Sequence, residues 1–145
     1  VPPRRGGVVI FLDSWIWLEY VFDGDDAAAA ADAIQRANTD AGGLIALTVI
    51  AEVSYRVRCV EDDAIAEETV RTIHDFDGIE SMPLVDEIAE YAAELRAEYY
   101  DPGERELSYA DAIHLATAVV HDDCDVLYSG DQDFEGIDAI ETVVL

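Results

Sequence analysis

The run Val8-Val9-Ile10-Phe11-Leu12-Asp13-Ser14 joins five apolar residues to an acid and a hydroxyl. A short, continuous apolar run is typical of a strand that is buried on both faces, as the strands of a parallel sheet are. The run therefore predicts such a strand over residues 8–12. It also predicts that a carboxylate, Asp13, stands where this strand ends.

Outward from that strand, the chain alternates short apolar runs with helical segments. Strands are also predicted at 44–47, 79–82, 125–128 and 139–145, and helices at 26–37, 48–60 with Thr48 as its cap, 62–76, 85–100 and 107–121, with one or two helical turns before residue 22. This alternation predicts an α/β domain with a largely parallel sheet covered on both faces. Two helices lie between the third and fourth strands, so one of them must be an excursion from a simple crossover.

The length fits a single domain over residues 8–145, since roughly 100 to 200 residues per domain is usual. Residues 1–7 are predicted to be a flexible N-terminal segment. The apolar run 8–22 contains two acids and is shorter than the roughly 20 residues that a membrane span needs. It also lacks the cleavage site of a signal peptide. We therefore expect a cytoplasmic protein with no membrane partner, in which Cys59 and Cys124 are reduced core residues.

The chain carries 33 acidic residues against eight Arg and no Lys, a net charge of −25. Charged residues make up 28% of the chain, close to the usual quarter, so the sign of the charge is unusual rather than its amount. This composition resembles that of cytosolic proteins of salt-accumulating halophiles, where concentrated salt screens self-repulsion. We expect an origin in a halophilic archaeon. The absence of Lys excludes Walker-loop, Schiff-base and receiver-domain chemistry.

Four acids are predicted to converge at one edge of the sheet. Ligands of open parallel α/β sheets bind beyond the carboxyl ends of the strands, near the point where strand order reverses. Asp13 ends the first strand, Asp131 follows the fourth, and Glu52 and Asp111 each lie in the first turn of a predicted helix. Carboxylates that meet there cannot all stay ionised without a cation. Because all the ligands are oxygens, the pattern predicts a Mg²⁺ or Mn²⁺ site for phosphoryl transfer.

Each of these acids also has a purely structural interpretation. Asp13 with Ser14 can cap a helix, and Ser108 with Asp111 fits a capping box. The remaining interpretations are an ion pair of Glu52 with Arg56 and loop or N-cap roles for Asp131 and Asp133. Only the joint placement of the acids on four separate segments favours the metal site.

Four stretches, in order along the chain, resemble the motifs of PIN-domain ribonucleases. They are Leu12-Asp13-Ser14, Thr48-x-x-x-Glu52-Val53, Leu-Ser-Tyr-Ala-Asp-Ala-Ile-His-Leu-Ala-Thr-Ala at residues 107–118, and Leu-Tyr-Ser-Gly-Asp-Gln-Asp-Phe at residues 127–134. The likeness covers residues 8–145 and is greatest to the VapC toxins of VapBC toxin–antitoxin pairs. It implies a three-layer PIN-like domain with a central, mostly parallel sheet of about five short strands flanked by helices.

The resemblance also implies an activity and a set of site residues. The activity is hydrolysis of RNA phosphodiester bonds by metal-activated water, in a homodimeric toxin that a VapB-like antitoxin neutralises. The Mg²⁺ or Mn²⁺ ligands would be Asp13, Glu52, Asp111 and Asp131, with Asp133 as a supporting acid of the metal site and Ser14 and Ser129 as polar supports. Trp15 and Gln132 depart from the family pattern, since many relatives have a small or amide residue and a basic residue at these positions.

Several alternatives stay open at this point. The chain could be a catalytically idle PIN-like binding or scaffold module, or a housekeeping RNA-processing nuclease. His114, three residues after Asp111, could be a metal ligand or a buried histidine that supports one. The acidity of the chain disfavours RNA unless metal ions bridge acid to phosphate. Five arginines are candidates either for contacts with RNA phosphates or for surface ion pairs: Arg4, Arg5, Arg56, Arg58 and Arg105. Four aromatic residues that follow Asp13 can pack in the core or contact a protein partner: Trp15, Trp17, Tyr20 and Phe22.

Overall fold

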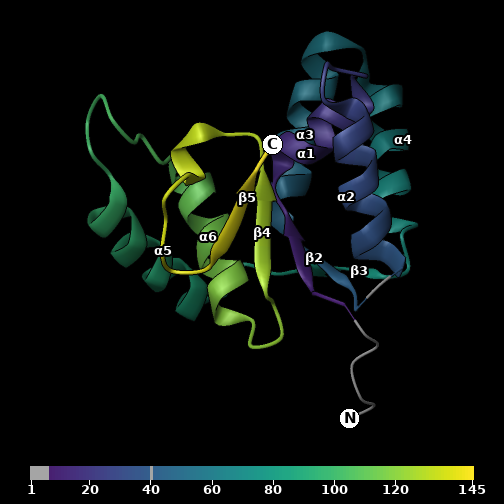
Figure 1. The fold of residues 1–145 in the computed structure, drawn as a ribbon. Coiled ribbons are helices and arrows are strands. Elements are labelled where there is room, and N and C mark those ends of the chain that lie inside the picture. The colour runs from purple at the N-terminus through teal and green to yellow at the C-terminus, as the bar shows by residue number, and fades with distance from the viewer. Residues whose placement is uncertain (1–6, 40) are drawn as a thin grey trace.

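A computed structural model describes residues 7–39 and 41–145. The predicted flexibility of residues 1–7 therefore concerns a segment that, except for Gly7, lies outside the described residues. The strands form one sheet in the order β3-β2-β1-β4-β5, and every neighbouring pair is parallel (Figure 1). Their bounds are β1 Ile10–Leu12, β2 Gly43–Ala46, β3 Ile79–Met82, β4 Val126–Ser129 and β5 Glu141–Val144. The predicted α/β fold with a five-stranded parallel sheet is confirmed.

A pair of helices follows each of the first three strands. The helices are α1 Ser14–Val21, α2 Ala27–Thr39, α3 Leu47–Val60, α4 Asp63–His74, α5 Asp86–Tyr99 and α6 Tyr109–Val120, with a short 3-10 helix η1 at Gln132–Phe134. The excursion predicted between the third and fourth strands is thus repeated in each of these connections. In Figure 1, α5 and α6 lie on one side of the sheet and α1 and α2 on the other. α2 packs on β1 and β2, and α6 packs on β2 and β4.

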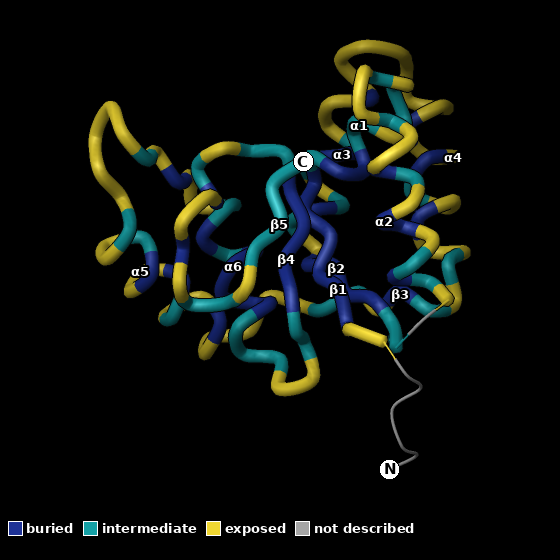
Figure 2. Tube along the Cα trace, in the orientation of Figure 1, coloured by how far each residue is buried: buried dark blue, intermediate teal, exposed yellow. Residues whose placement is uncertain are grey.

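The middle strands form the centre of the core. Ile10, Phe11 and Leu12 of β1 have no exposed surface, and β2 and β4 are buried along their whole length (Figure 2). Both faces of these strands are covered by helices, which is why their sequences are apolar without alternation. Each fully buried Ile or Leu contributes roughly 2 kcal/mol of hydrophobic free energy. β3 and β5, at the two edges, are more exposed.

Strand order reverses between β1 and β4. From β1 the chain moves outward to β2 and β3, and it then returns to place β4 on the other side of β1. The backbone N–H of Asp13 donates to the carbonyl of Tyr128 at 3.0 Å, which holds the carboxyl ends of these two strands together. Such a reversal is where open α/β sheets bind their ligands.

Three local predictions are wrong, and they concern Thr48, Glu52 and Cys59. Thr48 is not a helix cap, because α3 follows β2 directly from Leu47 and the N-cap is Ala46, which has no side-chain cap bond. Glu52 therefore lies in the second turn of α3 rather than the first. Cys59 is exposed on α3 and not in the core, whereas Cys124 is half-buried. Burial raises the pKa of the Cys124 thiol to about 11.

No helix in residues 7–39 or 41–145 combines the length and apolar character that crossing a bilayer requires.

Gly78 is expected to tolerate no side chain. A Cβ at this position would lie 2.0 Å from the backbone carbonyl oxygen of Asn38, whose own side chain accepts a hydrogen bond from the Gly78 N–H. We expect Gly78→Ala to lower the free energy of unfolding by about 1–3 kcal/mol, because the end of α2 and the start of β3 must move apart. Urea denaturation at constant KCl measures this loss.

Gly24→Ala is the matched control. The three atoms nearest to a Cβ there all belong to the carboxylate end of the Glu19 side chain, which can move away at the cost of its hydrogen bond from the N–H of Asp26. An equal loss of stability in both variants would contradict the proposed backbone clash at Gly78.

Candidate metal centre

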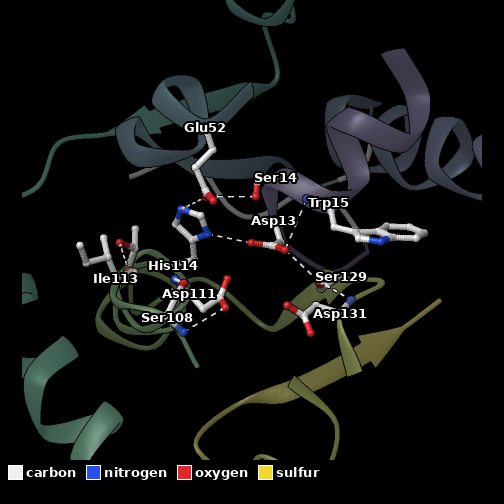
Figure 3. A network of polar contacts seen from close by, with 11 residues as sticks. Asp13, Ser14, Trp15, Glu52, Ser108, Asp111, Ile113, His114, Ser129 and Asp131 are labelled. Atoms are coloured by element: carbon white, nitrogen blue, oxygen red, sulfur yellow. Dashed lines mark hydrogen bonds and ion pairs between the residues drawn. The ribbon is translucent and has the colours of Figure 1, made fainter. Parts of the chain in front are cut away.

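Asp13 is the most deeply buried acid among the described residues, with 2% of its surface exposed. It caps α1, since one carboxylate oxygen, Oδ2, accepts a long bond of 3.4 Å from the N–H of Trp15. The same oxygen accepts a bond of 2.8 Å from the Ser129 hydroxyl at the end of β4. The other oxygen lies 2.7 Å from Nδ1 of His114. Figure 3 shows these contacts converging from β1, β4 and α6.

His114 has no exposed surface and lies between two carboxylates. Its Nδ1 contacts Asp13, and its Nε2 is 3.5 Å from Oε1 of Glu52, without a hydrogen-bond partner among the described residues. Burial alone would lower the pKa of His114, but the hydrogen bond to Asp13 and the charges of Asp13, Glu52 and Asp111 raise it overall. The spacing of His114 from Asp111 suggested two roles, and the structure places the ring inside the acidic cluster, against Asp13.

Glu52 reaches the cluster from α3. Its Oε1 accepts a bond of 3.1 Å from the hydroxyl of Ser14, and burial raises its pKa, as does the charge of Asp13, while His114 lowers it. Ser14, which was predicted to be a polar support of the site, thus contacts Glu52.

Asp111 and Asp131 complete the set of four acids. Asp111 forms the predicted capping box with Ser108, and burial together with the charge of Asp13 raises its pKa to about 6. Asp131 caps η1 by accepting from the N–H of Asp133 at 2.9 Å, and burial raises its pKa. Its own N–H donates to Ser129. The structural and functional interpretations of these acids are therefore compatible, because the caps set where each carboxylate lies.

Asp133 lies differently from the other four acids. Its Oδ1 accepts from the backbone N–H of Glu106 at 3.2 Å, so this oxygen ties the loop before α6 to η1. Arg105 strengthens the same junction, since its guanidinium donates to the carbonyls of Asp133 and Glu135. Arg105 was a candidate phosphate contact, and here it is engaged by backbone carbonyls. Arg58, another candidate, forms an ion pair with Asp63, while Arg4 and Arg5 lie outside the described residues.

Trp15, one of the departures from the family pattern, covers the start of the Asp131 loop. A Cβ on Gly130 would lie 2.1 Å from the indole ring, so the ring packs directly on this glycine. Trp17 is fully buried beside Phe76, with ring centroids 5.6 Å apart, whereas Tyr20 is exposed. The aromatic cluster after Asp13 thus contributes both to the core and to the surface.

The residues present fit a divalent metal ion. Asp13, Asp111 and His114 each offer a ligand atom, and these atoms all lie within 4.8 Å of one another. Glu52 lies beside this group, with its Oε1 3.5 Å from Nε2 of His114. Asp131 is linked to Asp13 through the hydroxyl of Ser129, which accepts from the N–H of Asp131 and donates to Asp13. Burial raises the pKa values of Glu52, Asp111 and Asp131, and repulsion from the negative charge of Asp13 raises them further. A cation bound there would relieve this repulsion.

Asp111 is expected to make metal-free protein less stable as pH rises. Its pKa is about 6 in the folded protein and 3.8 for an unperturbed aspartate, so between these pH values the folded state binds a proton that the unfolded state has lost. The contribution to stability is therefore present at low pH and lost as pH rises through 6. Asn does not titrate, so we expect the free energy of unfolding of Asp111→Asn, minus that of the wild type, to rise by roughly 2 kcal/mol from pH 4 to pH 7. Chemical denaturation with EDTA at constant ionic strength measures this difference, and a pH-independent difference would contradict it.

His114 and Asp13 are expected to be strongly coupled. We expect His114→Leu to destabilise the metal-free protein by about 3 kcal/mol, because the buried carboxylate of Asp13 loses the imidazole that pairs with it. Adding Asp13→Asn to this variant should restore part of the loss. A double-mutant cycle should therefore give a coupling energy of about 1–3 kcal/mol, and strictly additive losses would show that the contact contributes nothing.

No curated protein sequence matches the chain. Among solved structures, it is similar to VapBC2 from Rickettsia felis bound to promoter DNA (16% identity, 94% of this chain and 98% of that chain, TM-score 0.69). It is also similar to a toxin–antitoxin complex from Klebsiella pneumoniae (25% identity, 92% of this chain and 95% of that chain, TM-score 0.65). A third similar structure is VapC20 of Mycobacterium tuberculosis, a toxin that cleaves the sarcin–ricin loop (19% identity, 86% of this chain and 92% of that chain, TM-score 0.69). The PIN domain model matches residues 10–140, and the chain therefore belongs to the PIN-domain family.

Proposed function

We propose that this protein is a Mg²⁺- or Mn²⁺-dependent endoribonuclease that acts as the toxin of a type II toxin–antitoxin pair. The observation that carries the proposal is the convergence of Asp13, Glu52, Asp111 and Asp131, from four separate segments, at the reversal of strand order. Membership of the PIN-domain family supports a nuclease, and the similarity to VapC structures supports the toxin role.

The chemistry that a divalent ion supplies when bound is activation of water for in-line attack on a phosphodiester and stabilisation of charge on the leaving oxygen. The chain's own residues fix the carboxylates beforehand. Ser129 and His114 hold Asp13, Ser14 holds Glu52, and the Ser108 capping box holds Asp111. Such preorganisation reduces the cost of assembling a site when ligands bind. Asp133 would act as a supporting acid through the Asp131 loop.

The proposed partners are RNA and a VapB-like antitoxin. Several of the similar structures are toxin–antitoxin complexes, which supports a small protein partner. Half-buried Trp15, which directly follows Asp13 and Ser14, and exposed Tyr20, near the end of the same helix, α1, are candidate contacts for that antitoxin or for a second copy in a homodimer. The acidic surface and its expected halophilic origin imply that the protein acts in the cytoplasm at high salt.

RNA cleavage tests the proposal directly. We expect purified protein in molar KCl to cleave RNA with Mn²⁺ or Mg²⁺ and to stop when EDTA is added. Asp13→Asn and Asp111→Asn should each slow cleavage by at least about 100-fold, since losing a ligand should cost more than losing a residue that supports one. Gel analysis of labelled RNA measures the rates.

Asp122→Asn is the matched control. It makes the same acid-to-amide change at an exposed position beyond the far end of α6, and it should leave the rate unchanged. Cleavage that survives both EDTA and the two site variants would overturn the metal mechanism. A folded protein that binds no metal by calorimetry would instead be an idle binding module.

A further inference from the structure

A hollow of about 300 Å³ lies between the second half of α5 and the start of α6. Ala93, Arg96 and Ala97 line it from α5, together with Tyr100, the residue directly after this helix, and Tyr109, the first residue of α6, lines it from the other side. Residues spaced by three or four positions share one face of a helix, so α5 presents its three lining residues together. The volume suits a fragment-sized ligand.

Arg96 is held between the two tyrosine rings. The centre of its guanidinium is 4.5 Å from the Tyr100 ring and 4.3 Å from the Tyr109 ring, and Nε donates to the carbonyl of Leu107 at 3.0 Å. In the part of the chain that the structure describes, this guanidinium forms no ion pair, although the chain has 33 acids against eight arginines. A fixed cation without a carboxylate partner is available to an anionic ligand.

Both tyrosines also keep surface open to a ligand. Tyr109 is 69% exposed and Tyr100 is 37% exposed. Exposed aromatic rings beside arginine are the groups on which proteins stack the bases of single-stranded nucleic acids, with little dependence on sequence.

The hollow adjoins the carboxylate cluster through α6. Tyr109 and Asp111 both belong to the first turn of this helix, whose cap is Ser108. Residues two apart on a helix point to different sides, so Tyr109 and Asp111 face different sides of the same turn. The two residues are only about 3 Å apart along the helix axis, because an α-helix rises 1.5 Å per residue. A strand with one phosphodiester at the cluster would therefore have to turn around the start of α6 to bring a neighbouring nucleotide to the hollow.

We propose that this hollow is a base-stacking subsite for single-stranded RNA, in which a base stacks on Tyr109 and Arg96 faces the backbone. The proposal rests on the proposed ribonuclease function and names a substrate contact for it. RNA fits better than a peptide because it combines flat aromatic bases with negative charge, which match the rings and the free guanidinium. On a surface of net charge −25, phosphate contacts are few, so stacking must supply much of the affinity.

The test measures RNA binding without cleavage. The probe is fluorescein-labelled, single-stranded oligoadenylate, titrated with the full 145-residue chain in molar KCl with EDTA and followed by fluorescence anisotropy. High salt screens phosphate contacts and leaves stacking as the main contribution. We expect Tyr109→Leu to weaken binding by about 5- to 100-fold, because one base loses its stacking partner. Tyr109→Phe, which keeps the ring, should bind as wild type does.

Tyr55→Leu is the matched control. Tyr55 is 65% exposed on α3, and no arginine of the described residues stacks on its ring. Circular dichroism and thermal unfolding verify that all variants fold. Wild-type affinity in Tyr109→Leu, equal losses in Tyr109→Leu and Tyr55→Leu, or a loss in Tyr109→Phe as large as in Tyr109→Leu would each overturn the subsite. So would a Tyr109→Leu variant that binds RNA normally and loses only a protein partner.

RNA cleavage with Mn²⁺ is measured in parallel, so that a failure of the stacking subsite can be distinguished from a failure of the proposed ribonuclease function. A wild-type protein that cleaves RNA, with a Tyr109→Leu variant of unchanged affinity, overturns the subsite and leaves the nuclease intact. A wild-type protein that neither binds nor cleaves RNA overturns both.

Discussion

The buried carboxylate of Asp13 joins the parts of this structure that matter for function. It stands at the end of β1, accepts from Ser129 at the end of β4, and contacts His114 on α6. Residues 13, 114 and 129 are far apart in the chain, yet they meet because strand order reverses between β1 and β4. A buried carboxylate is costly unless it is paired and hydrogen-bonded, so these contacts are conditions for the fold as well as for the site.

Helix capping and the proposed metal binding use the same carboxylates. Asp13 caps α1, Asp111 completes the box with Ser108, and Asp131 caps η1. Each cap fixes its backbone and one side of its carboxylate, which leaves the other side for the cluster. The local stability of three helix starts and the geometry of the site thus depend on the same groups. A metal ion would add to contacts that already exist rather than create the arrangement.

The charged side chains of this protein lie in three different environments. Over most of the surface the acids are solvated, and concentrated salt would screen their repulsion. In the cluster, burial raises the pKa values of Glu52, Asp111 and Asp131, and the charge of Asp13 raises them further. Beside α6 the pattern is reversed, since Arg96 is stacked between two tyrosines and forms no ion pair with an acid of residues 7–39 or 41–145. A single net charge could not distinguish these three environments.

The sequence by itself determined the alternation of strands and helices, the α/β class and the four acids at one edge of the sheet. Apolar runs, capping motifs and turn residues report local structure, and a parallel sheet brings the ends of its strands to one edge. Only the tertiary structure decided what surrounds each residue. Thr48 and Cys59 were misjudged because their neighbours in the sequence do not reveal where α3 begins or which of its faces is covered. The pairing of His114 with Asp13 spans 101 residues, and Arg96 meets Tyr109 only because α5 packs against α6. Contacts of this kind depend on packing between elements, which no local pattern encodes.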